Sequence, residues 1–241
     1  MILIRSLIFA LYYYASLLLC AVLGAPQAAL SQRWAMAVPR AWARMTLFGM
    51  RWICGVKLVI EGREHIPTGP SIVAMKHLST LETMFPFIML KNPAIVIKQE
   101  LSDIPLFGWH TQRCGAIPVA RDTHASALRL MLRRARDEIA KGREIFIFPE
   151  GTRQEIDAPP DYKPGVAALY RDLAVAVTPV ATNTGLVWPA RGLLRYPGTV
   201  IVRFLPPIAP GLSRAEFMRR IEDDIETASQ ALLPAERRRR A

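Results

Sequence analysis

The chain is 241 residues long and 51% hydrophobic, which is enough for one α/β domain with a substantial core and a smaller appendage. Its 31 lysines and arginines exceed its 20 acidic residues and give a formal charge of +11, so we expect a partner with negative charge, either nucleic acid or anionic lipid. The three cysteines, Cys20, Cys54 and Cys114, are widely separated, which argues against a disulfide framework or a structural zinc site and is typical of a reducing compartment.

The N-terminal segment from Ser6 to Gly24 has no charged residue over nineteen positions, close to the roughly 20 that span a bilayer core. A cleaved signal peptide, with Arg5 as its basic end, is the alternative. The apolar run is longer than the usual signal core of about 7 to 15 residues, and Pro26 would spoil the best cleavage site. We therefore expect a retained membrane segment, and the mean hydropathy of +0.19 fits a chain with one such anchor.

A basic stripe follows this segment. Arg33, Arg40, Arg44 and Arg51 are spaced by 7, 4 and 7 residues, which places them on one face of a helix that Pro39 starts or interrupts. We expect this helix to lie at a lipid interface, although a solvated basic face on a core-packed helix is an equal alternative. By the positive-inside rule the arginines place the rest of the chain in the cytoplasm, against the inner membrane. Other faces of the helix are predicted to present Trp34, Trp42, Leu47, Phe48 and Trp52.

Residues 1–54 are thus predicted to form membrane-anchoring helices, and residues 55–241 one domain that ends in a helix and a basic tail. Apolar runs rich in β-forming residues predict strands, and helical patterns lie between or after several of them. This alternation predicts an α/β fold with a mostly parallel central sheet flanked by helices, whose sites lie beyond the carboxyl ends of the strands. The expected strands are residues 56–61, 71–75, 94–98, 116–120, 144–149, 174–180 and 199–205, and the expected helices are residues 80–90, 124–141, 164–172 and 213–233, the last opening with a capping box.

The segment HLSTLET places a histidine and a glutamate just beyond the strand that ends at Met75. Residues five apart on one helix point about 140° away from each other, so His77 and Glu82 can meet only if His77 lies in the turn before the helix. Two interpretations stay open for the glutamate. It is either the capping-box partner of Ser79 or a carboxylate that acts together with His77.

Two further predicted strands end in polar residues. The segment GAIPVARD ends at Arg121, and the segment IFIFPEGTR leads into Glu150, Gly151, Thr152 and Arg153. Glycine lets backbone N–H groups approach a phosphate or an oxyanion closely. Three polar strand ends together indicate one functional site at an edge of the sheet.

With these blocks in this order, the sequence resembles the 1-acyl-glycerol-3-phosphate acyltransferases and their relatives in glycerolipid synthesis. The resemblance covers about residues 50–205 and rests on KHLSTLE, GAIPVARD, FPEGTR and VTPVA, with KQELSDIPLFGW and YKPG as connecting segments. It implies a glycerolphosphate acyltransferase-like fold. In the family the first block is His-x4-Asp, whereas this chain has Glu82, which is one methylene longer.

The resemblance also implies an activity: transfer of a fatty acyl group from acyl-CoA or acyl carrier protein to the sn-2 hydroxyl of 1-acyl-glycerol-3-phosphate, making phosphatidic acid for phospholipid synthesis without a cofactor or metal. His77 would be the general base, Glu82 would orient its ring, and Arg121 would clamp the acceptor's phosphate. Gly151 would also help with the developing oxyanion. The implied substrate-binding residues are otherwise Glu150, Gly151, Thr152 and Arg153, with Lys98 and Lys163 as weaker candidates that are equally well explained as surface lysines.

Other functional classes fit less well. A nucleic-acid binder accounts for the charge but not for the apolar N-terminus, and we expect no nucleic-acid partner. A metallohydrolase needs clustered ligands, and the spacing of His65, His77, His110 and His124 matches no metal motif. A non-catalytic lipid-binding protein leaves the histidine and glutamate without a purpose. A sister acyltransferase for another lyso-lipid, such as a lyso-ornithine lipid, uses the same chemistry and stays open.

Overall fold

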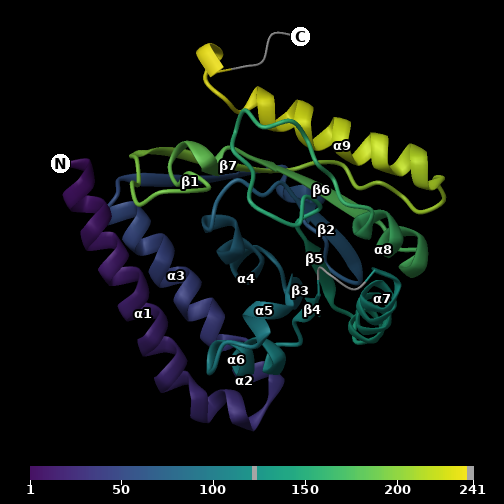
Figure 1. Cartoon of the computed structure of the whole chain (residues 1–241), viewed down its shortest axis with the longest axis horizontal. Coiled ribbons are helices and arrows are strands. Elements are labelled where there is room, and N and C mark those ends of the chain that lie inside the picture. The colour runs from purple at the N-terminus through teal and green to yellow at the C-terminus, as the bar shows by residue number, and fades with distance from the viewer. Residues whose placement is uncertain (121–123, 238–241) are drawn as a thin grey trace.

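A seven-stranded sheet runs through the centre of the protein, in a computed structural model that describes residues 1–120 and 124–237 (Figure 1). The strand order is β1-β7-β6-β2-β5-β3-β4, and every neighbouring pair is parallel except β6 and β7. The predicted fold class, a mostly parallel sheet flanked by helices, is therefore confirmed. The strands are β1 (Val56–Glu61), β2 (Ser71–Met75), β3 (Pro93–Lys98), β4 (Ile117–Val119), β5 (Glu144–Ile147), β6 (Val177–Thr182) and β7 (Gly198–Phe204).

Helices cover both faces of the sheet (Figure 1). The final helix opens with the predicted capping box, in which Ser213 and Glu216 each bind the other's backbone N–H. The α-helices are α1 (Ile2–Leu30), α2 (Gln32–Ala35), α3 (Ala37–Trp52), α4 (Phe85–Met89), α5 (Gln99–Ser102), α6 (Phe107–Arg113), α7 (His124–Ala140), α8 (Gly165–Leu173) and α9 (Arg214–Ala231). Short 3-10 helices are η1 (Arg63–His65), η2 (Leu81–Met84), η3 (Thr184–Leu186) and η4 (Ala235–Arg237).

Two apolar cores lie on opposite sides of the sheet, because side chains alternate along each strand. On β2, Val73 and Met75 join the core formed with α1, α3 and α4, whereas Ile72 and Ala74 join the core formed with α7, α8 and α9. All residues of β2 are buried. The strand is thus packed from both faces, and it gives the turn at its carboxyl end a rigid base.

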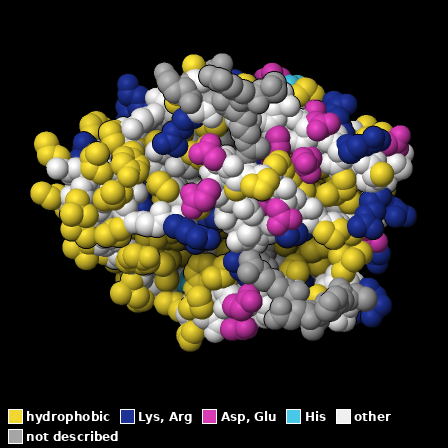
Figure 2. All heavy atoms as spheres, turned by 45° about the horizontal axis from the view of Figure 1, so that its top comes forward, with side chains coloured by type: hydrophobic (Ala, Val, Ile, Leu, Met, Phe, Trp, Pro, Cys, Tyr) yellow, Lys and Arg dark blue, Asp and Glu magenta, His cyan; other side chains and the backbone are white. Residues whose placement is uncertain are grey.

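The N-terminal helix α1 packs against the protein along one side and exposes apolar side chains along the other. Phe9 and Tyr13 belong to the core, and Ser6 accepts a hydrogen bond from the N–H of Arg195 at 2.8 Å. Within the described residues, α1 is the one helix long and apolar enough to cross a membrane, a test that a core helix or a signal sequence also passes. Figure 2 shows hydrophobic side chains gathered at its left edge, where α1 lies in Figure 1, and the exposed ones include Leu3, Ile4, Leu7, Ile8, Leu11, Leu18 and Leu19.

The basic stripe differs from the prediction. The helix breaks between α2 and α3, so Arg33 belongs to α2 and the other arginines to α3. The prediction that Phe48 and Trp52 lie on other faces is wrong: both are exposed beside Arg44 and Arg51, because residues four and seven apart share one face of a helix. The guanidinium of Arg51 lies 5.6 Å from the ring of Trp52. The exposed face of α3 therefore mixes cations with aromatic rings.

Candidate active site

His77 lies in the turn between β2 and η2, at the carboxyl end of a buried strand. Strand pairing continues to Lys76, whose N–H donates to the carbonyl of Val180 at 3.1 Å. The imidazole stacks on Phe148, with 3.8 Å between the ring centroids and 14° between the ring planes. The side chain of His77 is 13% exposed, so the ring is held by packing and keeps a small accessible edge.

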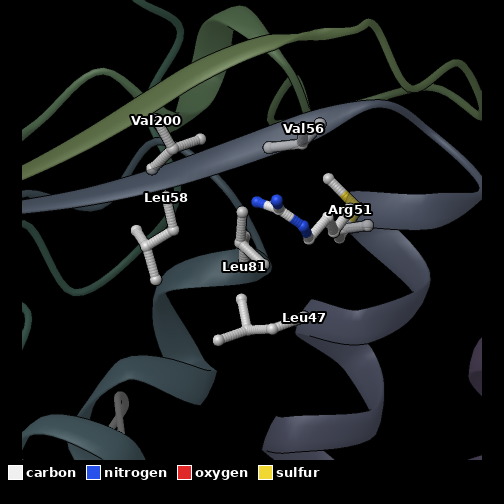
Figure 3. A pocket seen from close by; sticks show the side chains of 7 residues that line it. Leu47, Arg51, Val56, Leu58, Leu81 and Val200 are labelled. Atoms are coloured by element: carbon white, nitrogen blue, oxygen red, sulfur yellow. The ribbon is translucent and has the colours of Figure 1, made fainter.

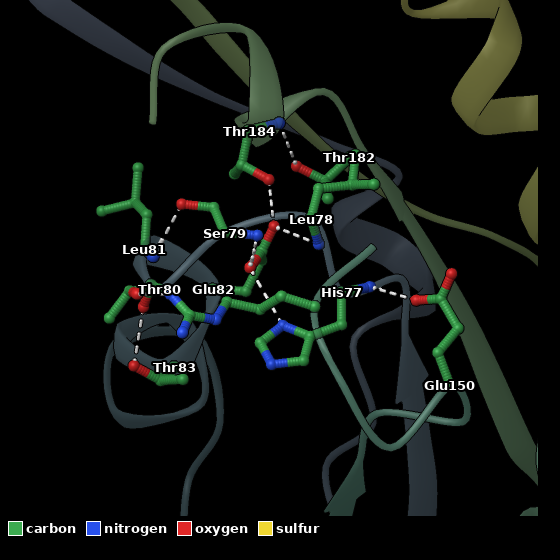
Figure 4. A network of polar contacts seen from close by, with 11 residues as sticks. His77, Leu78, Ser79, Thr80, Leu81, Glu82, Thr83, Glu150, Thr182 and Thr184 are labelled. Carbon is green, nitrogen blue, oxygen red and sulfur yellow. Dashed lines mark hydrogen bonds and ion pairs between the residues drawn. The ribbon is translucent and has the colours of Figure 1, made fainter. Parts of the chain in front are cut away.

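Glu82, on η2, is fully buried, and four donors converge on its carboxylate (Figure 4). Oε2 accepts a hydrogen bond from the N–H of Ser79 at 2.7 Å and lies 3.2 Å from Nδ1 of His77. Oε1 accepts from the N–H of Leu78 at 3.1 Å and from the hydroxyl of Thr184. An ionised carboxylate only accepts hydrogen bonds. All four contacts of Glu82 are therefore hydrogen bonds when Nδ1 of His77 carries the ring proton. Nε2 of the neutral ring then keeps its lone pair and is available as a base.

The structure contains features of both interpretations of Glu82. The capping box is half formed, because Glu82 reaches back to the N–H of Ser79 but the hydroxyl of Ser79 accepts instead from the N–H of Leu81 at 3.0 Å. The segment predicted to be helical, residues 80–90, is helical in the structure, but it begins as the 3-10 turn η2 and only then continues as the short helix α4, where Pro86 has no N–H to donate. This tighter turn brings the Glu82 carboxylate back onto His77.

Glu150 follows β5 and binds the backbone of the His77 turn (Figure 4). Its Oε2 accepts a hydrogen bond from the N–H of His77 at 2.7 Å, and its Oε1 lies 3.2 Å from Nζ of Lys76. The carbonyl of His77 accepts from the N–H of Gln154 at 2.8 Å. Burial raises the pKa of Glu150, while the Lys76 ammonium and the His77 N–H oppose that rise. Both oxygens of Glu150 thus serve the turn, and its contact with a substrate stays a prediction.

The rest of the FPEGTR segment lies beside the same turn. Gly151 has a φ of +66°, which favours glycine, and its N–H donates to the carbonyl of Phe148 at 3.0 Å, so this N–H is not available to an oxyanion in the structure. Thr152 is half-buried. Arg153 is exposed and donates from Nη1 to the hydroxyl of Thr80 at 2.8 Å. Arg153 therefore brings a guanidinium to the segment that contains His77 and Glu82.

The remaining predicted binding residues have separate locations. The N–H of Lys163 donates to the carbonyl of Pro149 at 2.8 Å, and its Nζ pairs with Asp161 at 2.5 Å. Lys98 is the last residue of β3 and is half-buried. Arg121 lies outside the described residues. Of these three, the structure places Lys163 beside the FPEGTR segment.

Three residues that the sequence did not single out belong to the site. Phe148 packs on the ring of His77, and Thr184 hydrogen-bonds Glu82 from 102 positions along the chain. Lys76 is 4% exposed and contacts Glu150. Its sequence signal was a lysine at the end of a buried apolar strand, because lysines are almost never fully buried unless paired. Thr184 gave no local signal.

An apolar cavity of about 140 Å³ lies beside the turn that contains Glu82, between α3, β1, β7 and η2 (Figure 3). Leu81, the neighbour of Glu82, forms part of its wall. The cavity provides space for a short apolar segment beside the site. Its lining is aliphatic apart from one cation: Leu47, Met50, Arg51, Val56, Leu58, Leu81 and Val200.

The cysteines are free thiols, and two of them are buried. Burial raises the pKa of Cys54 to about 11 and that of Cys114 to about 12, with nearby arginines opposing part of each rise. A neutral buried thiol is a poor nucleophile. In residues 1–120 and 124–237, no group of three or more His, Cys, Asp or Glu side chains is arranged to hold a metal ion.

Comparisons with known proteins show which sequences this chain is similar to. A 1-acyl-sn-glycerol-3-phosphate acyltransferase of Pseudomonas aeruginosa is 33% identical over 165 residues, which are 68% of this chain and 64% of that protein. An enzyme of the same name from Saccharomyces cerevisiae is 28% identical over 193 residues, 76% of this chain and 63% of that protein. This chain therefore spans less than two thirds of the length of either relative.

The fold is shared with a solved structure. The crystal structure of the 1-acyl-sn-glycerophosphate (LPA) acyltransferase PlsC from Thermotoga maritima superposes with a TM-score of 0.79 at 21% identity, covering 100% of both chains. A family model described as acyltransferase matches residues 57–183, which contain His77, Glu82 and the FPEGTR segment. This match extends over more than half of the sequence, and the chain belongs to the acyltransferase family.

Proposed function

We propose that the protein transfers a fatty acyl group from a thioester to the sn-2 hydroxyl of 1-acyl-glycerol-3-phosphate, giving phosphatidic acid. The observation that carries this proposal is the 3.2 Å contact between Nδ1 of His77 and the buried carboxylate of Glu82 at the end of β2. The acceptor is supported by the names of the two relatives, both 1-acyl-sn-glycerol-3-phosphate acyltransferases.

In this reaction the acceptor hydroxyl approaches Nε2 of His77. It gives up its proton while its oxygen attacks the carbonyl carbon of the thioester. The new C–O bond forms, the C–S bond breaks, and the imidazolium returns the proton to the leaving thiolate. General-base assistance of this kind typically contributes about 10²–10⁴-fold. Glu82 holds Nδ1 and stabilises the positive charge that the ring acquires.

We assign recognition of the acceptor's phosphate to Arg121 and Arg153. A guanidinium has a planar set of donors that binds phosphate oxygens in pairs. Arg121 is assigned from its place in the GAIPVARD block. Arg153 is supported by its 2.8 Å contact with Thr80, which holds its guanidinium at the His77 turn. Positive charges of this kind attract an anionic headgroup.

We place the protein at the inner membrane, with the sheet on the cytoplasmic side. The side of α1 that contains Leu11 and Leu18 is exposed and apolar, and α3 exposes Phe48 and Trp52 next to arginines. Aromatic rings and cations are the side chains that favour the headgroup region. Because the opposite side of α1 packs into the core through Phe9, this helix presents one side to lipid. The acceptor's acyl chain can then stay in lipid near the site.

The test is acyl transfer by the purified protein to a panel of lyso-lipids, with acyl-CoA and acyl carrier protein thioesters each offered as donor. We expect transfer to 1-acyl-glycerol-3-phosphate, and the panel also assigns the thiol carrier. Transfer to lyso-ornithine lipid alone would replace the acceptor but keep the chemistry. Failure to transfer to any acceptor from either donor, with folded protein in lipid vesicles, contradicts the proposal.

A further inference from the structure

Glu226 is on the C-terminal helix, yet it reaches the candidate active site through a single lysine. The helix α9 lies outside residues 57–183, which the family model matches. Nζ of Lys76 forms ion pairs with Glu226 and, at 3.2 Å, with Glu150. Glu150 in turn accepts the N–H of His77 at 2.7 Å. A continuous chain of contacts therefore runs from α9 to the backbone of the proposed base.

This chain of contacts is buried. Lys76 is 4% exposed and Glu150 is fully buried, while the side chain of Glu226 is 14% exposed. A charged side chain that is buried away from water is stable only when it is paired with an opposite charge. Here one ammonium serves two carboxylates, so neither carboxylate has a second cation in this chain of contacts. The position of the ammonium between them is therefore set by both glutamates.

Glu226 is itself held in place. Its Oε1 accepts a hydrogen bond from the hydroxyl of Tyr162 at 3.1 Å, in addition to its contact with Lys76. Its Oε2 is buried and has no hydrogen-bond partner among the described residues. The helix α9 is anchored separately by Phe217, Ile221 and Ile225, each fully buried in the core under the sheet. A change of the carboxylate alone should thus leave α9 seated.

We propose that Glu226 is a positioning residue for acyl transfer: it holds the ammonium of Lys76 against Glu150, and Glu150 thereby stays aligned on the N–H of His77. The inference rests on the proposed function. Lysine has a flexible four-carbon stem, and without its second partner the ammonium is free to follow Glu150 into other rotamers. The turn that holds His77 then loosens, while Arg153, to which we assign phosphate recognition, keeps its own contact with Thr80. The consequence falls on kcat and spares KM.

The first experiment compares Glu226→Gln with an acid-to-amide control on the same helix, Asp223→Asn, in steady-state acyl transfer. Asp223 is exposed on α9. Glu222 is half-buried and interacts electrostatically with Lys76 and Glu226, and is therefore unsuitable as a control. We expect Glu226→Gln to lower kcat about 10–100-fold, as a misplaced catalytic group does. KM for both substrates should stay within about threefold, and Asp223→Asn should match the wild type. A Glu226→Gln enzyme as active as the control overturns the proposal, as does a loss that appears mainly in KM.

A second experiment tests whether Lys76 and Glu226 act together. It remains informative even if one of the variants folds poorly. Lys76→Met leaves Glu150 and Glu226 as two buried carboxylates without a cation. Adding Glu226→Gln removes one of them, so the double variant should recover activity or folding relative to Lys76→Met alone. Losses that simply add in the double variant contradict the proposal. The wild type in the same assay separates the two hypotheses: an inactive wild type refutes the acyl-transfer function, whereas an active wild type with an equally active Glu226→Gln refutes only the role of Glu226.

Discussion

Glu82→Gln keeps the size of the side chain but puts an NH₂ donor where four donors already meet. If the NH₂ replaces Oε2, it faces the N–H of Ser79, and it can donate to Nδ1 of His77 only when the ring proton moves to Nε2, which removes the basic lone pair. If the NH₂ replaces Oε1, it faces the N–H of Leu78. Either orientation leaves one buried backbone N–H without an acceptor.

The size of each effect follows from these contacts. An unsatisfied buried donor costs about 1–3 kcal/mol of folding free energy. In a protein of this length each kcal/mol lowers the thermal midpoint by roughly 2–4 °C. The catalytic loss is larger, because the corresponding acid-to-amide change in a serine protease triad lowers kcat by about 10⁴-fold. We expect a fall in kcat on the order of 10³–10⁴-fold, or about 4–5.5 kcal/mol of transition-state stabilisation.

The assay is acyl transfer to 1-acyl-glycerol-3-phosphate at saturating thioester, paired with thermal unfolding of the same preparations. Glu82→Asp is the matched variant, because it keeps the charge and shortens the side chain by one methylene. A displacement of about 1 Å can cost around 10²-fold, so we expect Asp to lie between Gln and the wild type. Near-normal turnover in Glu82→Gln would refute the orienting role, leave Glu82 as a cap alone, and require another partner for His77.

Four further outcomes are expected. His77→Ala should abolish transfer with little change in thermal midpoint, and substantial residual turnover would disprove the general-base assignment. Arg121→Ala should raise KM for lysophosphatidate far more than KM for the thioester, whereas equal rises would indicate a structural role. Thr184→Val removes the hydroxyl that binds Oε1 of Glu82, so kcat should fall by about tenfold at unchanged KM, and an unaffected kcat would contradict this contact. The protein should resist extraction from membranes by high salt, and Leu11→Lys with Leu18→Lys, both at exposed positions, should weaken attachment; release by salt alone argues against an apolar anchor.

The strands could be predicted where local chemistry decides the structure. The bounds of β1 and β2 match the predicted ranges, because each is a short apolar run that ends at charged or turn-forming residues. The predicted strand at 174–180 begins instead at Val177, since Ala174 caps α8 in a left-handed conformation with φ +49°. An apolar alanine gives no sign of that conformation. The antiparallel pairing of β6 with β7 could not be predicted either, because sequence patterns do not give the relative direction of two strands.

In the candidate site, contacts between residues close in sequence could be predicted, whereas contacts between distant residues could not. The contact between His77 and Glu82 spans five residues, so turn geometry alone could anticipate it. The partners of Glu150 lie 73 and 74 positions away in the chain, and a motif that brings the segments together does not say which atoms meet. The sequence therefore indicated that Glu150 belongs to the site but not that it binds a backbone N–H. Such pairings depend on the strand order β6-β2-β5, which places the two segments at one edge of the sheet.

The two buried glutamates divide the task of holding one histidine. Glu82 fixes the ring through Nδ1, Phe148 supports one ring face, and Glu150 with Gln154 occupies the N–H and the carbonyl of His77. These contacts leave Nε2 as the ring nitrogen without an assigned partner in the described part of the protein, at the accessible edge of the ring. A base held so tightly does not have to be ordered when the substrates arrive, so its orientation is established by folding and not during the reaction. Because β2 is packed from both faces, this order extends from the sheet to Nε2, and in the proposed reaction the hydroxyl of the acceptor is the group that moves into place.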